Sequence, residues 1–133
     1  MDGTIVMLKI LIVDDSEAIR DKLRAFLGQC GHKVVGEAWD GKEAVTLYPE
    51  LKPDVVTMDI VMPEMDGLTA LQEIRAIDPK ARIIMLSSSA SARNIEIATK
   101  WGAYRFLVKP LPQEELKQVL EEIERNLKPE KAA

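Results

Sequence analysis

Cysteine and histidine are almost missing from this chain of 133 residues, which has one of each, Cys30 and His32. A single cysteine excludes an internal disulfide bond and a metal site built from cysteine thiolates. We expect Cys30 to lie half-buried at the end of a helix, as free cysteines often do. Because His32 is the sole histidine, we expect it to have a structural rather than a catalytic role.

Long apolar runs and an excess of positive charge are also missing. No stretch approaches the ~18 apolar residues of a membrane-spanning helix. The first residues, Met1 to Thr4, lack the basic segment of a secretory signal. The net charge of -4 argues against nucleic-acid binding. We therefore expect a cytoplasmic protein that has no membrane span and does not bind nucleic acid directly.

The composition is that of one globular domain. Hydrophobic residues make up 47% of the chain and charged residues 30%. A chain of this length buries about 65–70% of its unfolded surface, which is enough for a core of its own. We predict a single domain over residues 1–133, with a folded core at about residues 8–127 and a polar tail at residues 128–133.

Short apolar runs alternate with segments of helical periodicity. Continuous apolarity is typical of strands that are buried on both faces of a parallel sheet. We predict strands at residues 8–13, 34–38, 55–58, 83–86 and 106–108. A helix is predicted after each strand, with Ser16 as the N-cap of the first. Pro49 is expected to kink or end the second helix, and the fifth is expected to end before Pro129.

Five strand–helix units predict an α/β fold with a doubly wound, five-stranded parallel sheet and five helices. The strand order is then either Rossmann-like or flavodoxin-like, 2-1-3-4-5. Charged residues follow strands one, three and five, namely Asp14 and Asp15, Asp59, and Lys109. Only the flavodoxin-like order brings these three strand ends together, so we predict that order.

Ligands bind at the carboxyl edge of an open α/β sheet, where these four side chains are expected to meet. Asp14, Asp15 and Asp59 repel one another, and Lys109 offsets only part of their charge. A hard divalent cation would offset the rest, and Mg²⁺ suits a site of one or two carboxylates plus a phosphate. We therefore expect Mg²⁺ as the cofactor.

Five motifs occur in order along the chain: Asp14-Asp15, Asp59, Met62-Pro63 through Gly67, Ser87 and Lys109-Pro110. Together they resemble the receiver domain of response regulators, the phosphoacceptor half of two-component signalling, over about residues 8–127. The segment around Asp59 is particularly similar to stand-alone chemotaxis regulators. Two positions depart from the family pattern, Ser88 in place of Ala or Gly and Phe106 in place of Tyr.

The resemblance implies a role for each site residue. Asp59 would accept the phosphoryl group with Mg²⁺ present. Asp15 would bind the metal directly and Asp14 mostly through water, while Asp59 and the backbone carbonyl of Val61 would be further ligands. The chemistry would be self-phosphorylation and self-dephosphorylation, without turnover of a separate substrate.

Three further residues take their expected roles from the same resemblance. Lys109 would pair with Asp59 before the reaction and with a phosphoryl oxygen afterwards. Ser87 would hydrogen-bond another phosphoryl oxygen and, with Phe106, would form the conformational switch. The Lys109–Pro110 peptide bond is expected to be cis.

The expected phosphodonor is a sensor histidine kinase or a phosphotransfer protein. The expected output is binding of a downstream protein target on the face formed by residues 91–127. A stand-alone chemotaxis regulator or phosphorelay intermediate fits this pattern. The alternative is a receiver fragment of a longer regulator that has a DNA-binding or enzymatic output domain.

Three other classes compete with this interpretation. A flavin-binding protein would need a phosphate-binding loop after the first strand, where Asp14 and Asp15 would repel a phosphate. An aspartyl-phosphate phosphatase generally has a second acid two residues after its nucleophile, where this chain has Val61. A degenerate receiver would lack Asp59, Lys109 or the acidic pair, and all of these residues are present.

Overall fold

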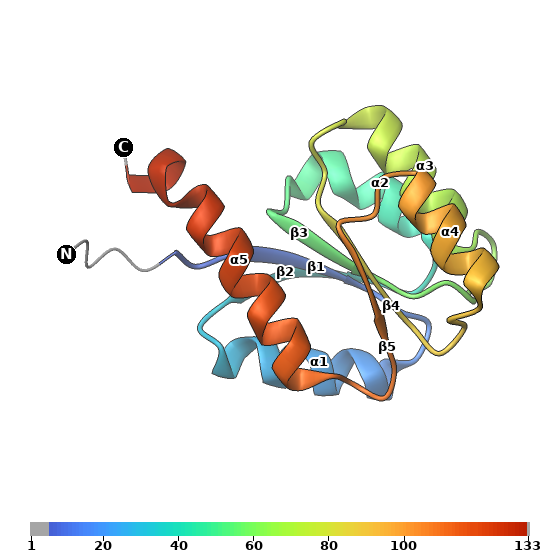
Figure 1. Ribbon diagram of the computed structural model, residues 1–133, viewed down its shortest axis with the longest axis horizontal. Coiled ribbons are helices and arrows are strands. Elements are labelled where there is room, and N and C mark those ends of the chain that lie inside the picture. The colour runs from blue at the N-terminus through green and yellow to red at the C-terminus, as the bar shows by residue number, and fades with distance from the viewer. Residues whose placement is uncertain (1–5, 133) are drawn as a thin grey trace.

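Strands and helices alternate along the chain in the computed structural model, which describes residues 6–132 and the side chains of residues 6–127 (Figure 1). The segment Met1 to Thr4 and the side chains of the predicted tail lie outside the described residues. The strands are β1 (Lys9–Val13), β2 (Lys33–Ala38), β3 (Val55–Met58), β4 (Ile83–Ser87) and β5 (Arg105–Val108). The helices are α1 (Glu17–Gln29), α2 (Gly41–Leu51), α3 (Gly67–Ile77), α4 (Ala92–Lys100) and α5 (Gln113–Ala132).

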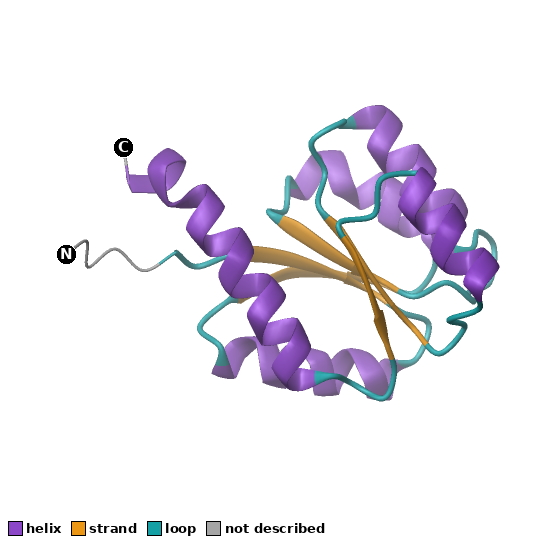
Figure 2. Cartoon of the chain, in the orientation of Figure 1, coloured by secondary structure: helices purple, strands orange, loops and turns teal. Residues whose placement is uncertain are grey.

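The five strands form one parallel sheet in the order β2-β1-β3-β4-β5. Helices α1 and α5 cover one face of this sheet, and α2, α3 and α4 cover the other (Figures 1 and 2). The predicted fold class, with its flavodoxin-like strand order, is confirmed. This order places β1 beside β3, so that the residues following these two strands are neighbours.

Each face of the sheet has its own hydrophobic core. On one face, Leu23 and Leu27 of α1 and Leu116 and Ile123 of α5 pack against β1 and β4. On the other face, residues of α2, α3 and α4 pack against the same sheet. The inner strands β3 and β4 are buried along their whole length, which explains why their residues are mostly apolar rather than alternating between apolar and polar.

Local signals set most helix boundaries. The Ser16 side chain accepts a hydrogen bond from the Ile19 N–H at 3.3 Å, which makes it the N-cap of α1 as predicted. Cys30 is the partly buried C-cap of the same helix, also as predicted. Gly31 follows with a φ of 87°, and Gly102 follows α4 with a φ of 88°. Both glycines adopt the left-handed conformation that ends helices readily.

Neither proline ends its helix, so the end of α5 expected before Pro129 is wrong, and of the two effects expected from Pro49 a kink stays a prediction. Helix α2 contains Pro49 and continues to Leu51, and α5 continues past Pro129 to Ala132. A proline inside a helix removes the hydrogen bond of its missing N–H and crowds the carbonyl four residues earlier. Both prolines lie in the last turn of their helix, so few residues follow the lost bond. The Lys109–Pro110 peptide bond is cis, as expected.

His32 is a structural residue near the amino edge of the sheet. Its Nδ1 accepts a hydrogen bond from the Leu8 N–H at 3.1 Å, and its Nε2 lies 2.9 Å from a carboxylate oxygen of Glu124 on α5. Burial lowers the pKa of His32 and outweighs the opposing effect of Glu124. The neutral imidazole therefore links the start of the sheet to α5.

Between residues 6 and 132, the helices are too short or too polar to cross a membrane.

Candidate functional site

The predicted side chains meet at the carboxyl edge of the sheet. Asp14 follows β1, Asp59 follows β3 and Lys109 follows β5. The Lys109 Nζ donates to Asp14 Oδ2 at 2.6 Å and to Asp59 Oδ2 at 3.0 Å. Asp15 joins this cluster, since carboxylate oxygens of Asp14, Asp15 and Asp59 lie within 4.8 Å of one another. Side chains from three separate strands therefore form one site.

Lys109 is a charged residue held between two carboxylates. Burial lowers the pKa of its ammonium group, but the hydrogen bonds to Asp14 and Asp59 outweigh burial, so that this pKa lies above its usual value. Three ionised carboxylates and one ammonium group carry a net charge of about -2. That excess of negative charge, with oxygen atoms only, fits a hard divalent cation.

The three carboxylates differ in how many of their oxygens are already bonded. Asp14 Oδ1 accepts from the Ser16 N–H at 2.9 Å, and Asp59 Oδ1 accepts from the Ile60 N–H at 2.7 Å. Both oxygens of Asp14 and of Asp59 thus have partners in the protein. Asp15 is exposed, and its carboxylate makes no hydrogen bond within residues 6–132. Asp15 is therefore the carboxylate most available to a cation.

Two glycines fix the loop that follows Asp59. The Gly67 N–H donates to the Ile60 carbonyl at 2.8 Å, and a Cβ on Gly67 would lie 1.8 Å from the Asp59 carbonyl oxygen. A Cβ on Gly41 would lie 2.5 Å from the carbonyl oxygen of Met65. Only glycine allows the first turns of α3 and α2 to approach this loop so closely. The backbone of Asp59 is therefore set by close helix packing.

Ser87 and Phe106 lie on the same face of neighbouring strands. Phe106 pairs with Met85 in the β4–β5 register, and Ser87 is two residues beyond Met85, so all three share the α4 face. Ser87 is buried, and its Oγ accepts from the Ser89 N–H at 3.0 Å. Phe106 is partly buried against the core of that face.

Val61, the remaining predicted site residue, follows Asp59 in the loop between β3 and α3. Its side chain is exposed, with 64% of its surface accessible. Its expected role as a metal ligand rests on its backbone carbonyl, and that role stays a prediction.

Sequence reasoning missed three features of the site. It did not expect the contact of Lys109 with Asp14, because a side chain's choice between two nearby carboxylates is not visible in a sequence. It included Gly67 in a motif without anticipating its contact with the Asp59 backbone. It also overlooked Arg20, whose guanidinium group donates to the Asp14 carbonyl at 2.7 Å. The position of Arg20, one turn after the N-cap Ser16, was the available signal.

The fold and the acidic site together define a receiver-type phosphoacceptor domain. A family model described as the response regulator receiver domain matches residues 10–121. The chain therefore belongs to the response regulator receiver domain family. Its relatives place it among the regulators of chemotaxis type within two-component signalling.

Two curated relatives are named chemotaxis protein CheY. The one from Bacillus subtilis is 47% identical over 119 residues, which are 90% of this chain and 97% of the relative. The one from Thermotoga maritima is 44% identical over 115 residues, which are 86% of this chain and 96% of the relative. These relatives are matched over nearly their whole length, so the comparison does not favour the alternative of a longer regulator.

A solved structure supports the same assignment. The crystal structure of the CheX–CheY–BeF3–Mg²⁺ complex from Borrelia burgdorferi contains a chain that is 36% identical. The match has a TM-score of 0.84 and covers 87% of this chain and 88% of that chain. The chain is thus a phosphoacceptor response regulator domain and not an enzyme with a separate substrate. The family match favours this assignment over the flavin-binding and phosphatase alternatives.

Proposed function

We propose that Asp59 is the phosphoacceptor and that Mg²⁺ is the metal at this site. The observation that carries the proposal is the position of Lys109, whose Nζ bridges Asp59 and Asp14, while the Asp15 carboxylate has no hydrogen bond among the described side chains of residues 6–127. An ammonium group beside the nucleophile can pair with an incoming phosphoryl group, and a free carboxylate beside both can bind the metal that offsets the remaining negative charge. Positioning and charge neutralisation provide most of the catalysis in phosphoryl transfer.

The metal fits the residues that are present. Asp14, Asp15 and Asp59, with the backbone carbonyl of Val61, would hold it, and its charge would neutralise the phosphoryl oxygens. During transfer, a bond forms between an Asp59 carboxylate oxygen and phosphorus as the bond from phosphorus to the donor nitrogen breaks. Lys109 then donates to a phosphoryl oxygen, and its positive charge offsets the charge that the product retains. Loss of the phosphoryl group to water completes a self-dephosphorylation.

Ser87 and Phe106 are proposed as the switch that reports phosphorylation. The Ser87 hydroxyl ends β4 beside the site, and a phosphoryl group adds strong acceptors that would attract it. A shift of Ser87 would act on Phe106, because both lie on the α4 side of neighbouring strands. The response is a change in the populations of two conformations rather than a new fold.

The output surface proposed is the face of α4, β5 and α5, within residues 91–127. It exposes three large apolar side chains, Ile95, Trp101 and Val108. β5 is the edge strand of the sheet, so this face is open along one side. Exposed apolar groups on an open face suit a protein partner.

The biological setting is proposed from the relatives. A sensor histidine kinase or phosphotransfer protein would be the donor, and a downstream protein would bind the output surface. The setting would be cytoplasmic, as part of chemotaxis or a phosphorelay. We propose that residues 1–133 act as one receiver domain with its core at about residues 8–127.

Phosphoryl uptake from acetyl phosphate tests the proposal. The wild-type protein is expected to gain one phosphoryl group with Mg²⁺ and none with excess chelator, measured as intact mass. Asp59→Asn is expected to gain none, because the amide keeps the shape of the carboxylate but is a poor nucleophile. Glu73→Gln, which removes an exposed carboxylate of α3, serves as the control. Uptake by Asp59→Asn, or undiminished uptake under chelation, would contradict the proposal.

A further inference from the structure

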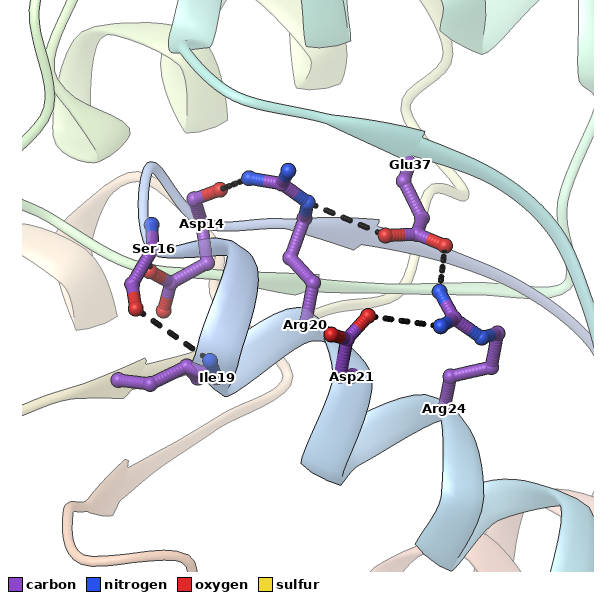
Figure 3. A network of polar contacts seen from close by, with 7 residues as sticks. All are labelled: Asp14, Ser16, Ile19, Arg20, Asp21, Arg24 and Glu37. Carbon is purple, nitrogen blue, oxygen red and sulfur yellow. Dashed lines mark hydrogen bonds and ion pairs between the residues drawn. The ribbon is translucent and has the colours of Figure 1, made fainter.

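Arg20 binds the backbone of the acidic pair. It lies in the first turns of α1, and its Nη1 donates to the Asp14 carbonyl oxygen at 2.7 Å. Side chains of a helix point back toward its amino end, so Arg20 reaches the strand end that precedes α1. Figure 3 shows this contact, together with the residues that hold the arginine in place. Only 15% of the Arg20 side chain is exposed.

The carbonyl that Arg20 binds belongs to the peptide group that joins Asp14 to Asp15. The N–H of Asp14 donates to the Ala38 carbonyl of β2 at 3.0 Å. The backbone at Asp14 is therefore held on both sides, by β2 and by Arg20. Because the peptide group is planar, a fixed carbonyl also fixes the direction in which the chain enters Asp15. The Asp15 carboxylate has no hydrogen bond of its own within residues 6–132, so its position depends on this backbone.

Glu37 holds Arg20 in one geometry. The Nε of Arg20 donates to Glu37 Oε1 at 3.1 Å. The other oxygen of Glu37 accepts from Arg24, which also donates to Asp21 at 2.7 Å. The planar guanidinium group of Arg20 thus binds the Glu37 carboxylate through its Nε and the Asp14 carbonyl through its Nη1. The flexible ammonium group of a lysine would hold two such partners less well. Arg24 shares Glu37 with Arg20 but has no contact with Asp14 (Figure 3).

A bulge in β2 turns Glu37 toward α1. Ile10 pairs with Val34, but Leu11 pairs with Gly36, so one extra residue enters β2 at this point. Glu37 consequently lies opposite Ile12, whose side chain packs in the core beside α1. Regular alternation from Val34 would have placed Glu37 on the other face. Bulges commonly redirect a side chain beside a functional site, and this bulge directs a carboxylate to Arg20.

We propose that Arg20 is a positioning residue for metal binding, which orients the Asp14–Asp15 peptide group so that the Asp15 carboxylate meets the cation. The inference rests on the proposed function in one respect, namely that Asp15 binds Mg²⁺. It adds a residue outside the ligand set, together with the support that Glu37 gives it. Arg20 acts through the backbone and touches neither the metal nor the phosphoryl group.

A positioning role and a simple charge effect predict opposite results. The positive charge of Arg20 lies near an acidic site, so charge alone would weaken the binding of a cation. Removing the charge would then strengthen Mg²⁺ binding. Removing a positioning residue weakens it, because Asp15 is no longer held where the cation needs it. The sign of the change therefore separates the two roles.

The test is a Mg²⁺ titration of the whole chain followed by the NMR shifts of the Asp14, Asp15 and Asp59 amides. Arg20→Gln is expected to raise the Kd roughly tenfold. Arg20→Lys, which keeps one donor and the charge, is expected to restore part of the loss. Arg24→Gln is the matched control and is expected to bind Mg²⁺ with the wild-type Kd. The ¹⁵N order parameter of the Asp15 amide is expected to fall in Arg20→Gln and to stay unchanged in Arg24→Gln.

Three results would overturn the inference. They are an unchanged or tighter Kd in Arg20→Gln, an equal loss in Arg24→Gln, and an unchanged order parameter at Asp15. If Arg20→Gln does not fold, the Mg²⁺ titration of Arg20→Lys is the test. A wild-type Kd for Mg²⁺ in that variant would overturn the inference. A wild-type protein that fails to bind Mg²⁺ would instead contradict the proposed function. The two failures are thus distinguishable.

Discussion

Lys109 shows at the scale of single residues how one side chain organises the site. Its ammonium group bonds both Asp14 and Asp59, so it holds two carboxylates together that would otherwise repel each other. Within the part of the chain that the structure describes, the Asp15 carboxylate has no hydrogen bond, so the three acids have different surroundings although their side chains are identical. Among the described residues, the Ser87 hydroxyl accepts from the Ser89 N–H and donates no hydrogen bond, so its hydrogen is available to a new acceptor.

Substitution of Ser87 separates the chemistry from the switch. We expect Ser87→Ala to accept a phosphoryl group at Asp59, because the Ser87 hydroxyl is not the nucleophile. Phosphorylation-dependent NMR shifts at Phe106 and along α5 should shrink, with about 1–3 kcal/mol of coupling at stake. The exposed Ser88→Ala is the control and should switch like the wild type. Full shifts in Ser87→Ala would show that the signal takes another route.

At the scale of secondary structure, the first turn of α3 helps to fix the position of Asp59. Gly67 brings the first turn of α3 against the carbonyl of Asp59, and the N-cap Asp66 accepts from the Thr69 N–H at 2.9 Å. The helix therefore begins where Gly67 lies against the backbone of Asp59, the proposed phosphoacceptor. Any residue with a Cβ at this position must displace the strand end or the helix.

Gly67→Ala should therefore impair both stability and chemistry. The added Cβ meets backbone rather than a flexible side chain, so we expect a loss of roughly 1–3 kcal/mol in the free energy of unfolding and slower phosphoryl uptake. Gly28→Ala in α1 is the matched control, since its Cβ would meet no atom within 4 Å. That change should instead stabilise the helix by about 0.5–1 kcal/mol. Equal unfolding free energies for the two variants would refute the close-packing argument.

The sequence allows all strands and helices to be predicted, but it does not allow some of their boundaries to be predicted. Continuous apolar runs located all five strands to within a residue or two, because buried parallel strands have few alternatives. Pro129 does not end α5 as expected, and Pro49 does not end α2, since a proline in the last turn removes one hydrogen bond and leaves the earlier turns in place. The bulge that turns Glu37 toward α1 left no sequence signal, because it arises from pairing between strands that are distant in sequence.

At the scale of the whole molecule, two cores on opposite faces of one sheet determine stability. The sheet is shared by both cores, so an unfavourable residue in an inner strand lowers the stability of both of them. Thr57 is a polar residue in such an inner strand. It lies in β3 between Ile12 and Ile84 and is 1% exposed. Its hydroxyl has no hydrogen-bond partner among the described residues. A buried, unpaired hydroxyl lowers the stability of the fold.

Thr57→Val should stabilise the protein. Valine has the same shape and no hydroxyl to desolvate, so we expect about 1 kcal/mol more unfolding free energy and a Tm higher by a few degrees. Thr99→Val is the control, because the Thr99 hydroxyl is exposed and donates to the Ile95 carbonyl at 2.8 Å. Denaturant unfolding of both variants measures the difference. A less stable Thr57→Val would mean that the hydroxyl has a partner after all.

The identity of the phosphorylated residue tests the central claim most directly. An acyl phosphate on a carboxylate is reduced by borohydride to the corresponding alcohol, which converts aspartate to homoserine at the modified position. Peptide mass spectrometry of the protein treated with acetyl phosphate and Mg²⁺, then reduced, locates that position. If Asp59 is the phosphoacceptor, homoserine appears at Asp59 alone. Homoserine at Asp14 or Asp15, or a phosphate retained on Ser87, would contradict it.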